Sequence, residues 1–132
     1  MADFEAVVAL WGTAGPGLPM RPSDTRDQIE LKVTRDPDLF LVAVDRTGVV
    51  GAVMGGWDGR RGYVYHLAVA AHLRRSGVAA ALMDELERRL RAKGALKLKC
   101  QAHADNAAGI AFLRGRGYLI EERLVPLGKE FD

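Results

Sequence analysis

The chain of 132 residues has the length of one domain, so residues 1–132 are expected to share one core. Its composition of 48% apolar, 27% charged and 7% aromatic residues excludes a disordered or fibrous protein. A formal net charge of +2, from 19 basic and 17 acidic residues, is too small to indicate nucleic acid as a partner.

The cysteine content and the first residues indicate the compartment. Cys100 is the only cysteine and cannot form an internal disulfide, and the start "MADFEAVVAL" has no basic region followed by a long apolar run. No apolar run approaches the roughly 20 residues that cross a bilayer. We therefore expect a cytoplasmic protein without a membrane partner. Three scattered histidines give no reason to expect a metal.

Two helices are expected before the first strand. The first has apolar residues at helical spacing, namely Phe4, Val7, Val8 and Trp11. A loop rich in glycine and proline follows, and then Ser23 or Asp24 is expected to cap a second helix that runs to about Arg35.

Three β-rich runs come next. Leu39–Val44 and Val49–Gly56 are separated by "DRTG", which is typical of an antiparallel hairpin, and Gly62–Val69 follows another turn. We expect these strands to form a meander.

Between about Gly77 and Gly94 the spacing of the apolar residues changes to that of a helix. Its apolar face consists of Val78, Leu82, Leu86 and Leu90. Its other face offers the i,i+4 ion pairs Asp84–Arg88, Glu85–Arg89 and Glu87–Arg91.

The last part of the chain predicts a strand at 96–102, a short helix that begins at Asp105 or Asn106, and further strands at 118–125 and 127–131. Because strands and helices are interspersed, we expect an α/β (α+β) fold with a mixed sheet and helices on both faces.

The stretch "LRRSGVAAAL", Leu73 to Leu82, joins the third strand to the long helix. The first N–H groups of a helix are unpaired and attract anions. Gly77 and Ala79 allow close approach to the backbone, and Arg74 and Arg75 add positive charge. The stretch therefore predicts a phosphate cradle, with a solvated turn as the alternative. It lacks the Gly-Lys-Ser/Thr of a nucleoside triphosphate loop and the glycines of a dinucleotide loop.

"HLAVAAHLRRSGVAAALMDELERRL" resembles the signature region of the GNAT superfamily of acyl-CoA N-acyltransferases. In that region a strand ending in Ala-Val precedes Arg/Gln-x-x-Gly-x-Gly/Ala, a pattern that Arg74, Gly77 and Ala79 match. "DNAAGIAFLRGRGY" resembles a later helix of the family. The likeness covers about Leu39 to Phe131 and is greatest for the YpeA-like bacterial branch.

The resemblance implies a mixed, mostly antiparallel sheet, and it implies acetyl-CoA as ligand. Family domains begin with a strand before the first helix, whereas this chain enters that helix at about Asp3, so we expect the first edge strand to be missing or truncated. The third strand would bind the pantetheine arm and polarise the thioester carbonyl, while the start of the long helix would hold the pyrophosphate. The cofactor residues so implied are Leu67, Ala68, Val69, Arg74, Arg75, Ser76, Gly77, Val78, Ala79, Ala80 and Asn106.

In such enzymes an amine attacks the thioester while a base takes its proton and an acid protonates the thiolate. The family's usual acid is a tyrosine, but Leu113 occupies its place and Tyr118 matches a packing aromatic. Tyr65 and His103 remain as candidates for proton transfer. Alternation along the third strand places Tyr63, Tyr65 and Leu67 on one face. We interpret His66 and Cys100 as packing residues.

The favoured hypothesis is an N-acetyltransferase that acts on a primary amine of a small molecule or peptide. Met20 and Arg21, in the loop between the first two helices, could contact this acceptor, and a homodimer is compatible with the sequence. The alternative is a slow or non-catalytic acyl-CoA-binding module, which Leu113 favours. A nucleic-acid binder using 88–99 is disfavoured, because its basic residues alternate with acids and lack aromatics.

Overall fold

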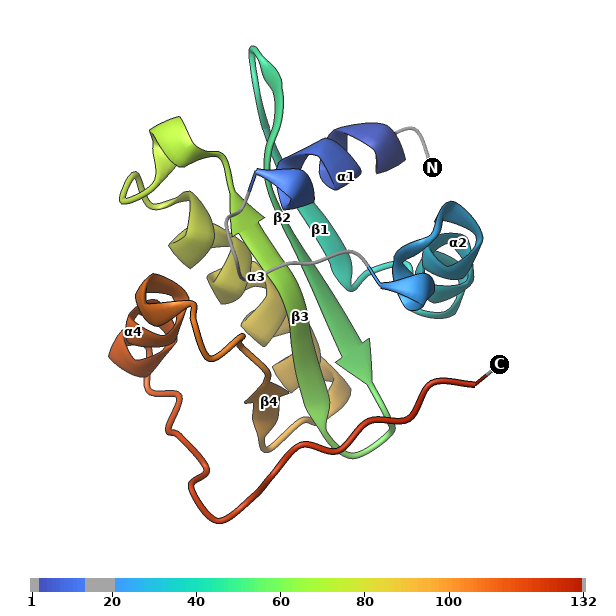
Figure 1. Cartoon of the computed structure of the whole chain (residues 1–132), viewed down its shortest axis with the longest axis vertical. Helices are drawn as coiled ribbons and strands as arrows, with labels where there is room; N and C mark the ends of the chain where they lie inside the picture. The colour runs from blue at the N-terminus through green and yellow to red at the C-terminus, as the bar shows by residue number, and fades with distance from the viewer. Residues whose placement is uncertain (1–2, 14–20, 132) are drawn as a thin grey trace.

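The computed structural model describes residues 3–13 and 21–131, which form a four-stranded sheet in the order β1-β2-β3-β4 (Figure 1). The strands are β1 Phe40–Asp45, β2 Gly48–Trp57, β3 Gly62–Val69 and β4 Leu98–Cys100. The first three pair antiparallel as a meander, and β4 runs parallel to β3. The predicted mixed, mostly antiparallel sheet is confirmed.

Helices cover both faces of this sheet, as expected. The helical elements are α1 Phe4–Gly12, η2 Pro22–Asp24, α2 Arg26–Arg35, η3 Ala71–Leu73, α3 Val78–Lys93 and α4 Ala107–Gly115. Figure 1 shows α1 in front of the strands and α3 behind them. No strand precedes α1 within the described residues.

The cap of α2 differs from the prediction. Thr25 is the N-cap, and its hydroxyl oxygen accepts a hydrogen bond from the N–H of Gln28 at 3.4 Å. Ser23 and Asp24 instead belong to the short helix η2, in which Pro22 occupies the first position. The prediction of Ser23 or Asp24 as cap was wrong because the 3-10 turn moves the helix start.

The predicted ends of α3 are confirmed, but most of its predicted ion pairs are not. Glu85 contacts Arg89 at 3.4 Å, as expected, and also Arg88. The carboxylates of Asp84 and Glu87 instead contact Arg116, which follows α4, at 2.7 and 3.1 Å. Arg116, which is distant in sequence, thus replaces the predicted partners Arg88 and Arg91 on the same helix.

The last predicted strands are wrong. The run at 96–102 forms a strand only over Leu98–Cys100, and 118–131 contains no strand. Glu121 contacts Lys97 at 2.9 Å and Lys99 at 3.4 Å, yet no backbone ladder joins this segment to β4 within the described residues. Alternating apolar residues favour a strand only where a neighbouring strand pairs with them.

Two apolar clusters lie on opposite faces of the sheet. The cluster under α3 consists of Leu39, Val53, Val64, Leu82, Met83, Leu86, Leu90, Ala95 and Leu113. The cluster under α1 consists of Val7, Leu10, Trp11, Ile29, Ala52, Met54 and Ala68. Neighbouring residues of β2 thus contribute to different faces, as a strand covered on both sides requires.

Glycines in β2 allow α3 to pack closely on the sheet. A Cβ atom at Gly51 would lie 2.8 Å from a side-chain carbon of Val78. One at Gly55 would lie 2.5 Å from a side-chain carbon of Leu86 and 3.3 Å from the carbonyl oxygen of Leu39. The absence of these side chains fixes the height of α3 above the sheet.

We expect Gly55→Ala to lower the free energy of unfolding by about 1–3 kcal/mol, because the added methyl group overpacks the buried Leu86. Gly12→Ala is the control, since a Cβ atom there meets nothing within 4 Å. It should leave the stability unchanged or raise it by up to about 1 kcal/mol. Urea unfolding measures both, and equal effects would contradict the packing argument.

Candidate functional site

The strands β3 and β4 pair only over three residues. The pairs are Gly62 with Leu98, Tyr63 with Lys99 and Val64 with Cys100. Beyond Val64, no strand among the described residues pairs with this edge of β3. Backbone groups on the edge of Tyr65–Val69 therefore remain available to a ligand.

A β-bulge interrupts β3 at the same place. Ala68 pairs with Ala52 and Tyr65 with Met54, so Val53 of β2 faces two residues, His66 and Leu67. His66 adopts φ of +50°, which is uncommon for a residue other than glycine. Bulges and such backbone outliers concentrate at functional sites, where they turn side chains in new directions.

The bulge changes which side chains share a face. The rings of Tyr63 and Tyr65 stack with centroids 6.1 Å apart, as predicted. Leu67 was predicted on the same face, and this was wrong, because it packs on the α3 cluster while Ala68 lies in the α1 cluster. The extra residue shifts the alternation by one position.

The predicted cradle has the geometry of an anion site. Gly77 is the N-cap of α3 with φ of +93°, and the first hydrogen bond of the helix runs from the N–H of Ala81 to the carbonyl of Gly77 at 2.9 Å. The N–H groups before Ala81 at the start of the helix thus have no partner within it. Ser76 donates its hydroxyl to the carbonyl of Leu73.

The remaining cradle residues are open to solvent. Arg74, Arg75, Ser76 and Gly77 are exposed, and Arg75 adopts φ of +65°. Only the short helix η3 and its flanking residues separate them from Val69 at the end of β3. The structure thus places the predicted cradle directly after the open edge of β3.

Asn106 forms the N-cap of α4, which confirms the predicted helix start. Its Oδ1 accepts a hydrogen bond from the N–H of Gly109 at 3.0 Å. The side chain therefore keeps its Nδ2 as a donor for a ligand.

Leu113 and Tyr118 contribute to packing. Leu113 belongs to the α3 cluster. The Tyr118 hydroxyl donates to Glu87 on α3 at 2.8 Å, and burial together with this carboxylate raises the pKa of Tyr118 well above its usual value. Tyr118 thus does not replace the absent acid.

The two predicted proton-transfer residues lie in different surroundings. The Tyr65 hydroxyl makes no hydrogen bond within the described residues, and burial raises its pKa, so the phenol stays protonated. The Nδ1 of His103 accepts the N–H of Asp105 at 3.2 Å, which makes His103 an anchor of the turn before α4.

An open groove of about 1890 Å³ brings several predicted residues together. It is lined, among others, by Arg21, Asp24, Tyr65, His66, Cys100 and His103. Met20 lies outside the described residues. No cluster of three potential metal ligands occurs among the residues that the structure describes.

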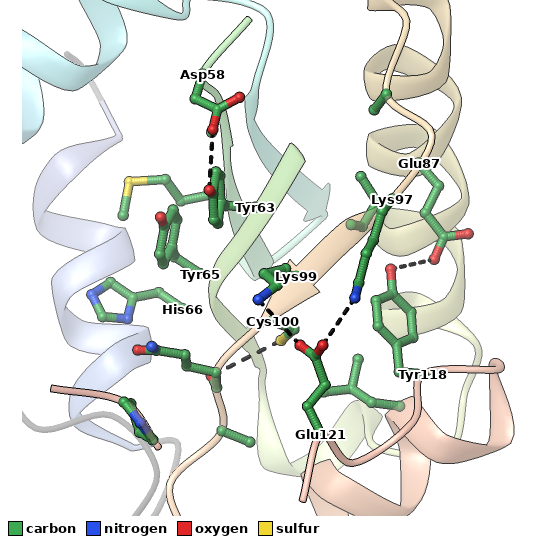
Figure 2. A pocket seen from close by; sticks show the side chains of 18 of the residues that line it. Asp58, Tyr63, Tyr65, His66, Glu87, Lys97, Lys99, Cys100, Tyr118 and Glu121 are labelled. Atoms are coloured by element: carbon green, nitrogen blue, oxygen red, sulfur yellow. Dashed lines mark hydrogen bonds and ion pairs between the residues drawn. The ribbon is translucent and has the colours of Figure 1, made fainter. Parts of the chain in front are cut away.

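The structure also pairs two residues that the sequence prediction missed. His66 Nε2 lies 2.8 Å from Oδ1 of Asp24, a carboxylate that is 3% exposed. The ring of Trp11 on α1 meets the ring of His66 edge-on at 4.8 Å. Figure 2 shows His66 beside Tyr65. The two partners are 42 residues apart, and no local pattern indicated the contact.

Comparisons with known proteins agree with this arrangement. The model of the acetyltransferase (GNAT) family matches residues 5–118. An acetyltransferase of Pectobacterium atrosepticum is 45% identical over 128 residues, which cover 96% of this chain and 88% of the relative.

Solved structures show the same fold. Ard1 from Thermoplasma volcanium has a TM-score of 0.78 at 26% identity, covering 90% of this chain and 78% of Ard1. The PaiA N-acetyltransferase from Thermoplasma acidophilum, solved in complex with coenzyme A, also has a TM-score of 0.78, at 18% identity, covering 91% and 86%.

The fold and site define an N-acyltransferase, an enzyme that moves an acyl group from a thioester to an amine. The chain belongs to the acetyltransferase (GNAT) family, which takes its acetyl group from acetyl-CoA. Each helix of the described segments is too short or too polar to cross a membrane.

Cys100 lines the groove, and burial raises the pKa of its thiol to about 11. At pH 8 we therefore expect it to react with a thiol reagent about 100-fold more slowly than an ordinary thiol, because only the thiolate reacts. The rate should rise as the pH approaches 11. Protein unfolded in urea is the control, and equal rates in the native and unfolded states would contradict this environment.

Proposed function

We propose that this enzyme transfers the acetyl group of acetyl-CoA to a primary amine of a small molecule or peptide, in the cytoplasm. The observation that carries the proposal is the separation of β3 from β4 directly before the exposed N-terminus of α3. An unpaired strand edge suits an extended amide chain, and a helix N-terminus suits a pyrophosphate.

Acetyl-CoA would lie along this path. The edge of Leu67–Val69 would bind the pantetheine arm, and the backbone N–H groups of Gly77–Ala80 would hold the pyrophosphate, with Arg74 adding charge. The N–H of Ser76 already donates to the carbonyl of Leu73 at 3.2 Å. The Nδ2 of Asn106 would contact the arm from the side of α4. Its Oδ1 already accepts the N–H of Gly109.

In the reaction the amine nitrogen forms a bond to the carbonyl carbon, and the carbon–sulfur bond breaks. The nitrogen loses a proton, and the thiolate gains one. Positioning and hydrogen bonds to the developing oxyanion supply the larger share of the rate. The open β3 edge at Leu67–Val69 offers such donors.

The acceptor would enter through the groove on the side of η2. Arg21 lines this groove and is exposed, so its guanidinium would be the group that contacts an acceptor carboxylate. Met20 would lie next to it along the chain. The family relationship supports an amine acceptor, and small molecules and peptides both fit an open groove.

A second candidate is an acyl-CoA-binding module with slow or absent turnover. Leu113 favours it, because this leucine occupies the family's usual acid position and cannot donate a proton. Tyr65 on β3 favours the enzyme instead, because its protonated phenol would be a proton donor in place of the missing tyrosine.

Gly77→Asp tests the cradle. We expect it to weaken acetyl-CoA binding at least about 10-fold, because a carboxylate repels the pyrophosphate. Aspartate tolerates positive φ better than most residues and favours a helix N-terminus, so unfolding would not explain the loss.

The matched control is Gly94→Asp. Gly94 has φ of +112° at the other end of α3, and, as at Gly77, a Cβ atom there meets nothing within 4 Å. Calorimetric titration with acetyl-CoA should show unchanged affinity for this control. Equal affinities for the two variants would contradict the cradle.

Leu113→Tyr separates the enzyme from the module. If the missing acid limits a slow enzyme, the new phenol should raise kcat by about 10-fold or more, within the range of general acid catalysis. Release of free thiol from acetyl-CoA over a panel of amines, amino acids and peptides measures turnover. Intact cofactor binding with no turnover in either protein would favour the module.

A further inference from the structure

We propose that His66 is the base that takes the proton from the acceptor amine, and that Asp24 is the residue that positions it. The inference rests on the proposed transfer reaction. It changes the interpretation of His66 from a packing residue to a catalytic one, and it assigns a role to a buried carboxylate.

The pairing fixes the tautomer of the ring. An ionised carboxylate only accepts hydrogen bonds, so the neutral His66 ring carries its proton on Nε2, which lies 2.8 Å from Asp24 Oδ1. Nδ1 then has a free lone pair, and it makes no hydrogen bond within the described residues. This is the arrangement that a general base requires.

Asp24 is held in place for this contact. Its side chain is 4% exposed, and its second oxygen, Oδ2, accepts the backbone N–H of Arg21 at 3.0 Å. Both carboxylate oxygens are therefore engaged. The short helix η2 thereby joins the loop on the acceptor side to the bulge of β3.

The ring of His66 is oriented from a second side by Trp11 of α1, whose ring lies edge-on at 4.8 Å. Among the elements packed against the ring, η2 contributes the charged Asp24, α1 contributes the neutral Trp11, and Tyr65 is its titratable neighbour on β3. Charge that develops on the imidazole is thus compensated by Asp24.

The position of His66 fits proton removal. It directly precedes Leu67–Val69, the part of the open β3 edge that would hold the thioester, and its side chain remains 21% exposed toward the groove. Figure 2 shows it on the groove side of β3, next to Tyr65. His103 also lines the groove, but its Nδ1 already accepts the N–H of Asp105.

Apart from water, the reaction needs no other reactant to account for its protons. As the amine nitrogen bonds to the carbonyl carbon, its proton passes to Nδ1 of His66, and the resulting imidazolium is stabilised by Asp24. The electrons of the carbon–sulfur bond go to sulfur. The thiolate takes a proton from water, and His66 returns its proton to solvent, which leaves an amide and a thiol.

The first test uses His66→Asn and His66→Gly, because asparagine and glycine tolerate the positive φ at this position. We expect kcat/KM to fall at least about 100-fold with acetyl-CoA binding retained. The wild-type rate should decline as the pH falls through the range in which imidazole takes up a proton. Both variants should lose this decline of the rate at low pH, which is the acid limb of the pH profile.

Added imidazole should restore part of the activity of His66→Gly, because it can occupy the space of the missing ring and take the proton. A purely structural His66 would not respond in this way. His72→Asn is the matched control on the exposed η3, and it should keep both the rate and the acid limb.

Two results would overturn the proposal. One is that folded His66 variants that bind acetyl-CoA keep the wild-type kcat/KM and its pH profile. The other is that the acid limb disappears in His103→Asn and persists in His66→Asn, which would assign the base to His103.

The Asp24–His66 pair can be measured without an acceptor. Nitrogen NMR of isotopically labelled histidine should resolve the 3 histidines of the chain and show His66 as the Nε2–H tautomer. Asp24→Asn should weaken this preference for the Nε2–H tautomer, because an amide donates as well as accepts hydrogen bonds. An Nδ1–H tautomer in the wild type would overturn the proposal. A wild-type protein that acetylates no amine would overturn the transfer reaction itself, even where NMR shows the pair.

Discussion

The site depends on the separation of β3 from β4 after three residue pairs. Buried or half-buried backbone groups need partners, and a parallel neighbour would supply them along the whole of β3. Here the chain leaves β4 at Cys100 and turns toward the Asn106 cap of α4, so the edge beyond Val64 stays unpaired. A ligand with amide groups along its length can supply the missing hydrogen bonds.

The bulge at His66 and Leu67 decides which way the residues of this edge face. One extra residue in β3 reverses the alternation, so that Leu67 packs toward α3 while His66 contacts α1 and η2. In the proposed reaction, cofactor contacts and acceptor chemistry thereby belong to neighbouring residues. The glycines Gly51 and Gly55 let α3 pack closely on β2, which sets the position of its N-terminus relative to the same edge.

Much of the fold could be predicted because local chemistry decides it. Gly77 and Gly94 bound α3, Asn106 caps α4, and the three-stranded meander follows from short turns between β-rich runs. The start of α2 and the strands at 118–125 and 127–131 were mispredicted. The short helix η2, which begins at Pro22, moves the start of α2 to a later residue. The two strands would form only beside a neighbouring strand that pairs with them, and the sequence pattern does not reveal whether such a neighbour exists.

The sequence by itself determined the α3 helix with the glycine turn at its start and, through Arg74, Gly77 and Ala79, the family of the protein. These features depend on residues close together in the chain. Only the tertiary structure decided that Asp24 meets His66 across 42 residues and that Leu67 leaves the face of Tyr65. Contacts between distant segments and a one-residue shift in register arise from packing, and no local pattern specifies them.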